Sequence, residues 1–169
     1  MKRAFCLIGV FVMAGFVLAG PVQEKKPPSA AEIAKAQQAT DLLQATLFAA
    51  LLQEFSETTP ENAPRGIQSI GLVFNDKNTN MRLVGTRQPL SDNDLPRDPF
   101  EERALANALA GQPTTDVQKV EGEWVYRRSI PLSNFHPACV MCHINFPAVV
   151  NPTDWVGALM LKVPIETTK

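Results

Sequence analysis

The sequence predicts an α+β domain in which a long N-terminal helix and an inserted second helix accompany an antiparallel sheet. Two capping sequences, at Ser29 and Asp98, each precede a segment whose apolar residues recur at helical spacing. Short apolar segments with alternating side chains, separated by turn-forming residues, follow each helix and are typical of strands. A long helix followed by an antiparallel sheet with a helix inserted is an α+β arrangement.

The N-terminal residues 1–19 predict a signal for export that is cleaved from the mature chain. Lys2 and Arg3 form a basic start, an uncharged and mostly apolar stretch follows, and Val17 and Ala19 are small residues at the −3 and −1 positions. A retained membrane anchor is the alternative, but a stretch of about 16 residues is shorter than the roughly 20 that cross a bilayer. We expect the mature protein in the periplasm.

A single domain at 29–169 is expected after a flexible tether at 20–28, which contains no core-forming pattern. Ser29 and Glu32 fit a capping box, so a helix should begin here and continue to about Phe55. Its predicted apolar face consists of Ile33, Ala36, Leu43, Leu47, Ala50 and Leu51, widened by Leu42, Leu52 and Phe55.

The next segment predicts two short strands, because Ile70, Leu72 and Phe74 alternate with other residues. The expected order is a loop at Thr58–Arg65, a strand at Ile67–Phe74, a turn at Asn75–Asn80, a strand at Met81–Val84 and a loop at 85–97. A second helix should then begin with Asp98 as N-cap and Pro99 at its first position, and end at Gly111. Its expected apolar side consists of Phe100, Ala104, Ala108 and Leu109.

The C-terminal third predicts a hairpin, a long loop and a last strand. The hairpin joins Val117–Val120 to Trp124–Ile130 through Glu121-Gly122-Glu123, the loop covers 133–153, and the last strand is Trp155–Ile165. Alternation places Trp124, Tyr126 and Ile130 on one face of their strand, with Arg128 interrupting it. In the last strand it places Trp155, Leu159, Leu161, Val163 and Ile165 on one side and Met160 and Lys162 on the other.

Composition restricts the function. The chain has 45 % hydrophobic and 20 % charged residues and a net charge of −1, which argues against a nucleic-acid partner bound through a basic surface. Of its three cysteines, Cys6 lies in the export signal, so the expected mature chain retains Cys139 and Cys142. Its two histidines are His136 and His143, which excludes mechanisms that need more imidazoles.

Cys139, Cys142 and His143 form the sequence C-x-x-C-H, the attachment signature of c-type haem. Two thiols at this spacing can each reach one vinyl group of the same porphyrin, and the adjacent imidazole can bind the iron. A disulfide would leave the histidine unexplained, and a thioredoxin-type pair normally opens a helix after a strand. A zinc site, with His143 or His136 as a ligand, usually needs a second pair of ligands. We therefore expect covalent haem c, with His143 as the metal ligand.

Over residues 29–165 the sequence resembles a family of single-haem domains with a PAS-like fold, formerly catalogued as a domain of unknown function. The resemblance rests on six segments of the sequence: the alanine-rich N-terminal helix, Val84–Arg87, Asp98–Glu101, the aromatic strand Trp124–Leu132, Cys139–His143 and Gly157–Pro164. The resemblance implies a PAS-like antiparallel sheet with covalent c-type haem in a late loop. Members occur as periplasmic proteins and as sensor ectodomains.

The chain departs from this family at two positions. Some members use a cysteine from the region after the N-terminal helix as second axial ligand, whereas Phe74 stands at the comparable place here. Ile144 follows the haem histidine where members often have glycine. Cys–His ligation is therefore not carried over, and the sixth iron ligand stays open between Met160, Met81, His136, a lysine, water or none. Met141 lies inside the attachment loop and would face the wrong way.

Further candidates surround the expected haem. The candidates for its wall are Phe74, Phe135, Phe146, Trp124 and Trp155, with ordinary core packing as the alternative. The candidates for propionate partners are Arg87, Arg127 and Arg128, with solvent exposure as the alternative.

The expected function is that of a periplasmic mono-haem c-type cytochrome that transfers electrons to or from a redox partner protein. The alternative is a haem-based module that senses redox state or binds a diatomic gas and, having no output domain of its own, acts through a separate signalling protein. With His143 on the iron, only His136 remains for acid–base chemistry, so a peroxidase-like enzyme is not supported. No membrane contact beyond the export signal is expected.

Overall fold

The computed structural model describes residues 26–57, 59, 61–74, 80–85, 94–134, 136, 137, 139 and 151–167. The predicted export signal and most of the predicted tether lie outside these residues, as do Cys142 and His143. The elements are α1 (Ala30–Ser56), α2 (Ala63–Val73), β1 (Met81–Val84), α3 (Pro99–Ala108), β2 (Thr114–Val120), β3 (Glu123–Asn134) and β4 (Asn151–Pro164). The predicted α+β class, with a long N-terminal helix and an inserted helix, is confirmed.

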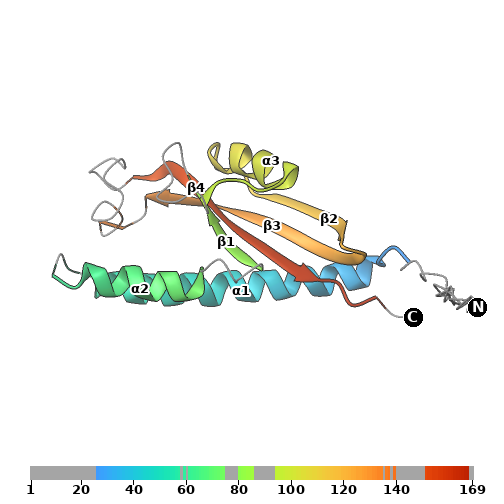
Figure 1. Ribbon diagram of the computed structural model, residues 1–169, viewed down its shortest axis with the longest axis horizontal. Helices are drawn as coiled ribbons and strands as arrows, with labels where there is room; N and C mark the ends of the chain where they lie inside the picture. Colours follow the sequence, from blue (N-terminus) through green and yellow to red (C-terminus); the bar gives the residue numbers. More distant parts are fainter. Residues whose placement is uncertain are drawn as a thin grey trace, which may run out of the picture.

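The strands form one antiparallel sheet of four strands in the order β1-β4-β3-β2. Its centre is the pair of long strands β3 and β4, of 12 and 14 residues. Helix α1 lies along one face of the sheet and α3 lies on the other (Figure 1). In the described part of the chain, no helix is long and apolar enough to cross a membrane.

Helix α1 begins as predicted. The Ser29 hydroxyl oxygen accepts from the backbone N–H of Glu32, and the Glu32 carboxylate accepts from the backbone N–H of Ser29 at 2.7 Å. Its predicted apolar face is partly wrong, because Leu43 is 37 % exposed and Leu42 is 70 % exposed. The sheet instead covers a narrower stripe, whose members are Ile33, Ala36, Thr40, Leu47 and Phe48.

Helix α2 replaces the strand that was predicted at Ile67–Phe74. Ile70 and Phe74 are separated by four residues, so they fit a helical face as well as a strand. Leu72, the middle member of the predicted strand face, is 72 % exposed. Pro64 lies in the first turn, where a missing N–H costs no hydrogen bond, and it helps the helix begin after Asn62. The predicted loop, which extended to Arg65, therefore ends three residues earlier, at Asn62.

Strand β1 and helix α3 occupy the predicted positions. The Asp98 carboxylate accepts from the backbone N–H of Glu101 at 3.0 Å, which confirms Asp98 as N-cap. Leu109 is 38 % exposed and does not belong to the buried side of α3 as predicted, because the helix ends at Ala108.

The hairpin β2–β3 turns at Glu121 and Gly122, whose φ angles are 52° and 86°. Two successive positive φ angles define the type I′ turn that suits the twist of a two-residue hairpin. Both of its strands are longer than predicted.

The loop between β3 and β4 is shorter than the predicted 133–153. Asn134 pairs with Asn151, and the register shifts between Leu132 and Asn134 so that β4 contributes extra residues. These polar residues have little strand propensity, and the pairing of β3 with β4 determines their extended backbone. The two strands thus continue to the base of the loop that carries the cysteines.

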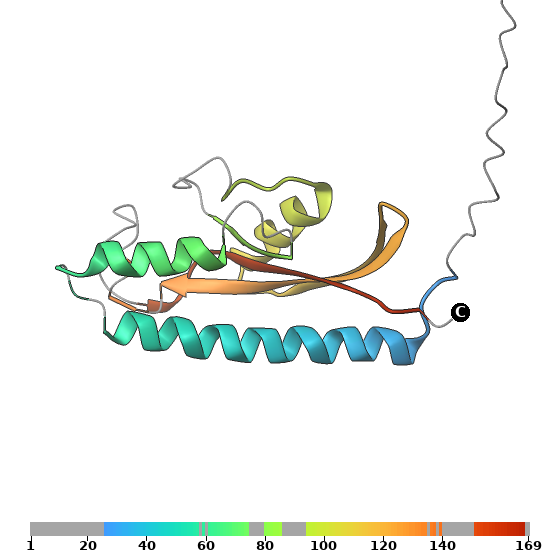
Figure 2. The ribbon, with the colours of Figure 1, turned by 60° about the horizontal axis from the view of Figure 1, so that its bottom comes forward.

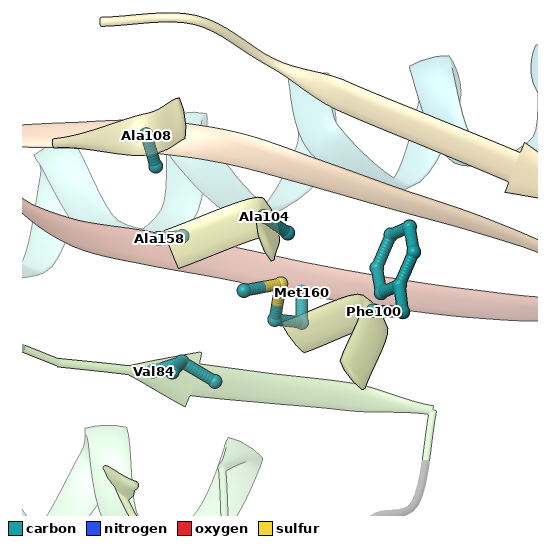
Figure 3. Packing of buried hydrophobic residues seen from close by; sticks show 6 residues of the cluster. All are labelled: Val84, Phe100, Ala104, Ala108, Ala158 and Met160. Carbon is teal, nitrogen blue, oxygen red and sulfur yellow. The ribbon is translucent and has the colours of Figure 1, made fainter. Parts of the chain in front are cut away.

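Clusters of buried hydrophobic residues lie on both faces of the sheet. Toward α1, one cluster contains Ala36, Tyr126 and Ile165, and another contains Ile130, Leu159 and Leu161. Toward α3, the cluster consists of Val84, Phe100, Ala104, Ala108, Ala158 and Met160 (Figure 3). The predicted alternation of Leu159 and Leu161 against Met160 is confirmed.

Candidate functional site

The first residue of the C-x-x-C-H motif lies near the C-terminal end of α1. Cys139 is half-buried, and its backbone N–H donates to the carbonyl oxygen of His136 at 2.9 Å. The imidazole of His136 stacks on the ring of Phe55, with 5.9 Å between centroids and 19° between planes. The α1–α2 connection, the C-terminal end of β3 and the start of β4 lie at this same end of the molecule (Figure 2).

Apolar side chains continue from this end along the α1 face of the sheet. Ile130, Leu159 and Leu161 form the buried centre. The half-buried residues packed against it are Leu47, Phe48, Phe74, Met81, Leu83 and Leu132. Phe74, a predicted wall residue, belongs to this cluster, and Phe48 lies about two helical turns before Phe55. This end therefore combines a cysteine, two stacked rings and an adjoining apolar cluster.

Met160 and Met81, two candidates for the sixth iron ligand, lie on opposite faces of the sheet. Met160 is 4 % exposed and packs between β1 and α3, beside Ala104 and Phe100 (Figure 3). It pairs with Ser129, five residues along β3 from Asn134, so it lies roughly 17 Å from the base of the loop. Met81 lies on the α1 face, at the register position of Leu161.

The arginines predicted as propionate partners have partners within the protein. Arg128 forms an ion pair with Asp41 of α1. Arg127 is buried on the α3 face, where its Nη1 donates to Asp98 at 2.8 Å. Arg87, Phe135 and Phe146 lie outside the described residues. The alternative for these arginines, solvent exposure, does not hold for Arg127 and Arg128, whose side chains are 9 % and 21 % exposed.

The aromatic candidates Trp124 and Trp155 contact other parts of the fold. Trp124 packs against the cluster of Ala36, Tyr126 and Ile165. The indole of Trp155 lies against Gly111, beyond the end of α3.

Sequence reasoning missed an ionic cluster on the α3 face, in which Arg82, Glu101 and Arg127 are largely buried and Asp98 is 38 % exposed. The Glu101 carboxylate pairs with Arg82 and lies 3.5 Å from Nη2 of Arg127. The Arg127 guanidinium also lies over the ring of Phe100, 4.2 Å from its centroid. The sequence predicts the N-cap at Asp98. The ion pair of Asp98 with Arg127 of β3, and that of Glu101 with Arg82 of β1, depend on the tertiary fold.

The cluster shifts the ionisation of its outer carboxylate. Burial alone raises the pKa of Asp98, but the hydrogen bond from Arg127 and the backbone N–H of Glu101 outweigh it. The resulting pKa is lower than the ordinary value of 3.8, so Asp98 is ionised at neutral pH.

An open pocket of about 210 Å³ adjoins this cluster. Its described lining residues are Asn80, Arg82, Arg97, Asp98, Glu101, Val120, Arg127, Met160, Leu161 and Lys162. The pocket therefore combines charged groups with an apolar wall. It lies on the face of the sheet opposite to α1.

Comparisons with known proteins do not assign the chain to a family. No family model matches it. No curated protein matches it either. Within the described residues, no three histidine, cysteine or acidic side chains come together as a metal site.

Proposed function

We propose that the chain is an exported mono-haem c-type cytochrome that acts in electron transfer. The observation that carries this proposal is the C-x-x-C-H sequence. Its first residue, Cys139, donates its backbone N–H to His136, whose ring stacks on Phe55. Cys139 and Cys142 would form the two thioether bonds, and His143 would bind the iron. Bound haem would supply one-electron redox chemistry.

The described side chains would serve as a hydrophobic support for such a group. Phe55 and His136 present stacked rings near Cys139. The apolar cluster of Ile130, Leu159 and Leu161 keeps water away from the α1 face of the sheet. Low polarity around an iron centre is one of the factors by which a protein sets its potential. The four-stranded antiparallel sheet and its long helix are compatible with a PAS-like fold, which supports kinship with the PAS-like single-haem domains.

Export and partners belong to the same proposal. Residues 1–19 would direct the chain to the periplasm and be removed, and haem attachment of this kind takes place outside the cytoplasm. A redox partner protein would then exchange electrons with the domain.

A second candidate function, binding or sensing of a diatomic gas, is favoured by the position of Met160. Its side chain is enclosed by Ala104 and Phe100 on the α3 face, so it is a poor sixth ligand for iron held near Cys139. An accessible iron site would give a large spectral shift when carbon monoxide is added to the reduced protein. An unchanged spectrum would favour six-coordinate iron and electron transfer.

The test of haem attachment is expression of the exported protein together with a haem-attachment system, followed by haem staining on a denaturing gel. We expect staining of the wild type, and weakened or lost staining in Cys139→Ser and Cys142→Ser. Cys6→Ser is the matched control and should stain like the wild type, because residue 6 would be removed. Well-exported wild-type protein without staining would refute the proposal. His143→Ala should change the spin state of the iron, and an unchanged spectrum would exclude His143 as its ligand.

A further inference from the structure

The pocket on the α3 face carries an excess of positive charge. Four basic side chains line it, Arg82, Arg97, Arg127 and Lys162, together with two acidic side chains, Asp98 and Glu101. The formal charge of these described lining residues is therefore +2. The acidic groups are held by the arginines, since Glu101 pairs with Arg82 and Asp98 pairs with Arg127.

Lys162 differs from Arg82 and Arg127 because it has no acidic partner among the described residues. It lies directly opposite Arg127 in the β3–β4 ladder, on the same face of the sheet. Like charges at such positions destabilise a sheet. No carboxylate of the described residues lies within ion-pair distance of Lys162, whereas Arg127 is paired with Asp98 and Glu101.

Arg127 contributes a second unsatisfied group. Its side chain is 9 % exposed, and its Nε is buried without a hydrogen-bond partner in the described structure. The two Nη atoms are engaged by Asp98, Gln118 and Glu101. A buried donor that lacks a partner costs about 1–3 kcal/mol, so such groups generally have a ligand, a water or a function.

We propose that this pocket binds a small organic carboxylate. The ammonium of Lys162 would donate to its oxygens, and the charge of +2 would be balanced by a dianion. Val120 and Met160 form the apolar part of the lining and would contact the carbon chain, whereas the Leu161 side chain points to the α1 face. At about 210 Å³ the pocket is smaller than the roughly 300–1,000 Å³ of drug-sized sites, which fits a molecule of a few carbon atoms.

The apolar lining favours a carboxylate over an inorganic anion. Phosphate or sulfate would gain the same attraction from Lys162, but neither carries carbon that could contact Val120 or Met160. The site lies on the face of the sheet opposite to α1 and uses neither cysteine of the motif. The inference is therefore independent of haem attachment.

The test is calorimetric titration of the full exported protein with succinate at low ionic strength. Succinamide, the neutral diamide, and inorganic phosphate serve as comparison ligands. We expect succinate to bind with one site per chain, succinamide to give no binding, and phosphate to bind at least tenfold more weakly. Equal binding of succinate and phosphate would overturn the carboxylate assignment, and the absence of succinate binding would overturn the site.

Lys162→Gln locates the site without removing a known structural contact. It should weaken succinate binding about tenfold, as expected for the loss of a hydrogen bond to a charged group, while the melting temperature stays close to that of the wild type. Lys35→Gln, on the exposed side of α1, makes the same change of charge and should bind succinate like the wild type. Equal affinities of the two variants would refute a role for Lys162.

Discussion

His136 stacks on Phe55 with 5.9 Å between ring centroids, and this contact ties the chain that leads into Cys139 to the last turns of α1. Because the N–H of Cys139 donates to the carbonyl of His136, the cysteine backbone is held by the same turn. One residue of a helix thus positions the start of the candidate haem motif.

Phe55→Ala should loosen this turn. We expect the free energy of unfolding to fall by about 1 kcal/mol, the value typical of an aromatic pair. In a Cys142→Ser background, the rate at which an alkylating reagent modifies the Cys139 thiol should rise. Leu52→Ala, at a residue of the same helix that is 48 % exposed, is the control. Equal alkylation rates in the two variants would show that Phe55 does not hold the turn.

The elements that depend on local sequence were predicted well. Ser29 with Glu32 and Asp98 with Glu101 each form hydrogen bonds within three residues, so their capping patterns can be recognised without the fold. Ile67–Phe74 could not be decided locally, since its apolar spacing fits both a strand and a helix. The exposure of Leu72 shows which periodicity the fold uses.

The parts that sequence reasoning missed depend on contacts between distant residues. Arg127 is 29 residues from Asp98, and no local pattern indicates that they pair. Asn134 and Asn151 are extended because β3 pairs with β4, although asparagine is disfavoured in strands. For the candidate site, the motif was found from spacing alone, whereas the stacking of His136 on Phe55 required the fold.

Glu101→Gln should be the most destabilising single change in the ionic cluster. It leaves the charges of Arg82 and Arg127, whose side chains are 11 % and 9 % exposed, without their shared carboxylate. Loss of one partner from a buried ion pair costs about 3–5 kcal/mol. Chemical denaturation measures the effect. Arg103→Gln removes the exposed pair with Asp116 and should cost less than about 1 kcal/mol. Similar costs for the two variants would contradict the buried character of the cluster.

Asp98 should make the fold sensitive to acid. Its pKa in the folded protein is lower than the ordinary value of 3.8, so it stabilises the fold fully above that value. This contribution is lost as the pH falls through the lowered pKa. Asp98→Asn keeps an N-cap side chain but removes the charge, and it should flatten the loss of stability below about pH 4. Denaturation curves recorded over a pH series measure this slope.

Asp98→Ala separates the cap from the charge. Alanine cannot accept the hydrogen bond from the N–H of Glu101, so it should cost about 1 kcal/mol for the cap alone, in addition to the lost ion pair with Arg127. If the free energy of unfolding of Asp98→Asn falls in acid as steeply as that of the wild type, other carboxylates dominate the pH dependence.

Gly111 and Gly122 form a matched pair that separates backbone strain from packing. Both have positive φ angles, 75° and 86°, which cost a non-glycine residue about 1–2 kcal/mol. A Cβ at Gly122 would meet nothing within 4 Å, whereas a Cβ at Gly111 would lie 2.5 Å from Nε1 of Trp155. Gly122→Ala should therefore show the strain alone. Gly111→Ala should lose a further 1–3 kcal/mol, about the cost of overpacking, and shift the fluorescence of Trp155. If both variants unfold at the same denaturant concentration, the indole of Trp155 can move away from Gly111 at no cost, and the end of α3 is not held by this contact.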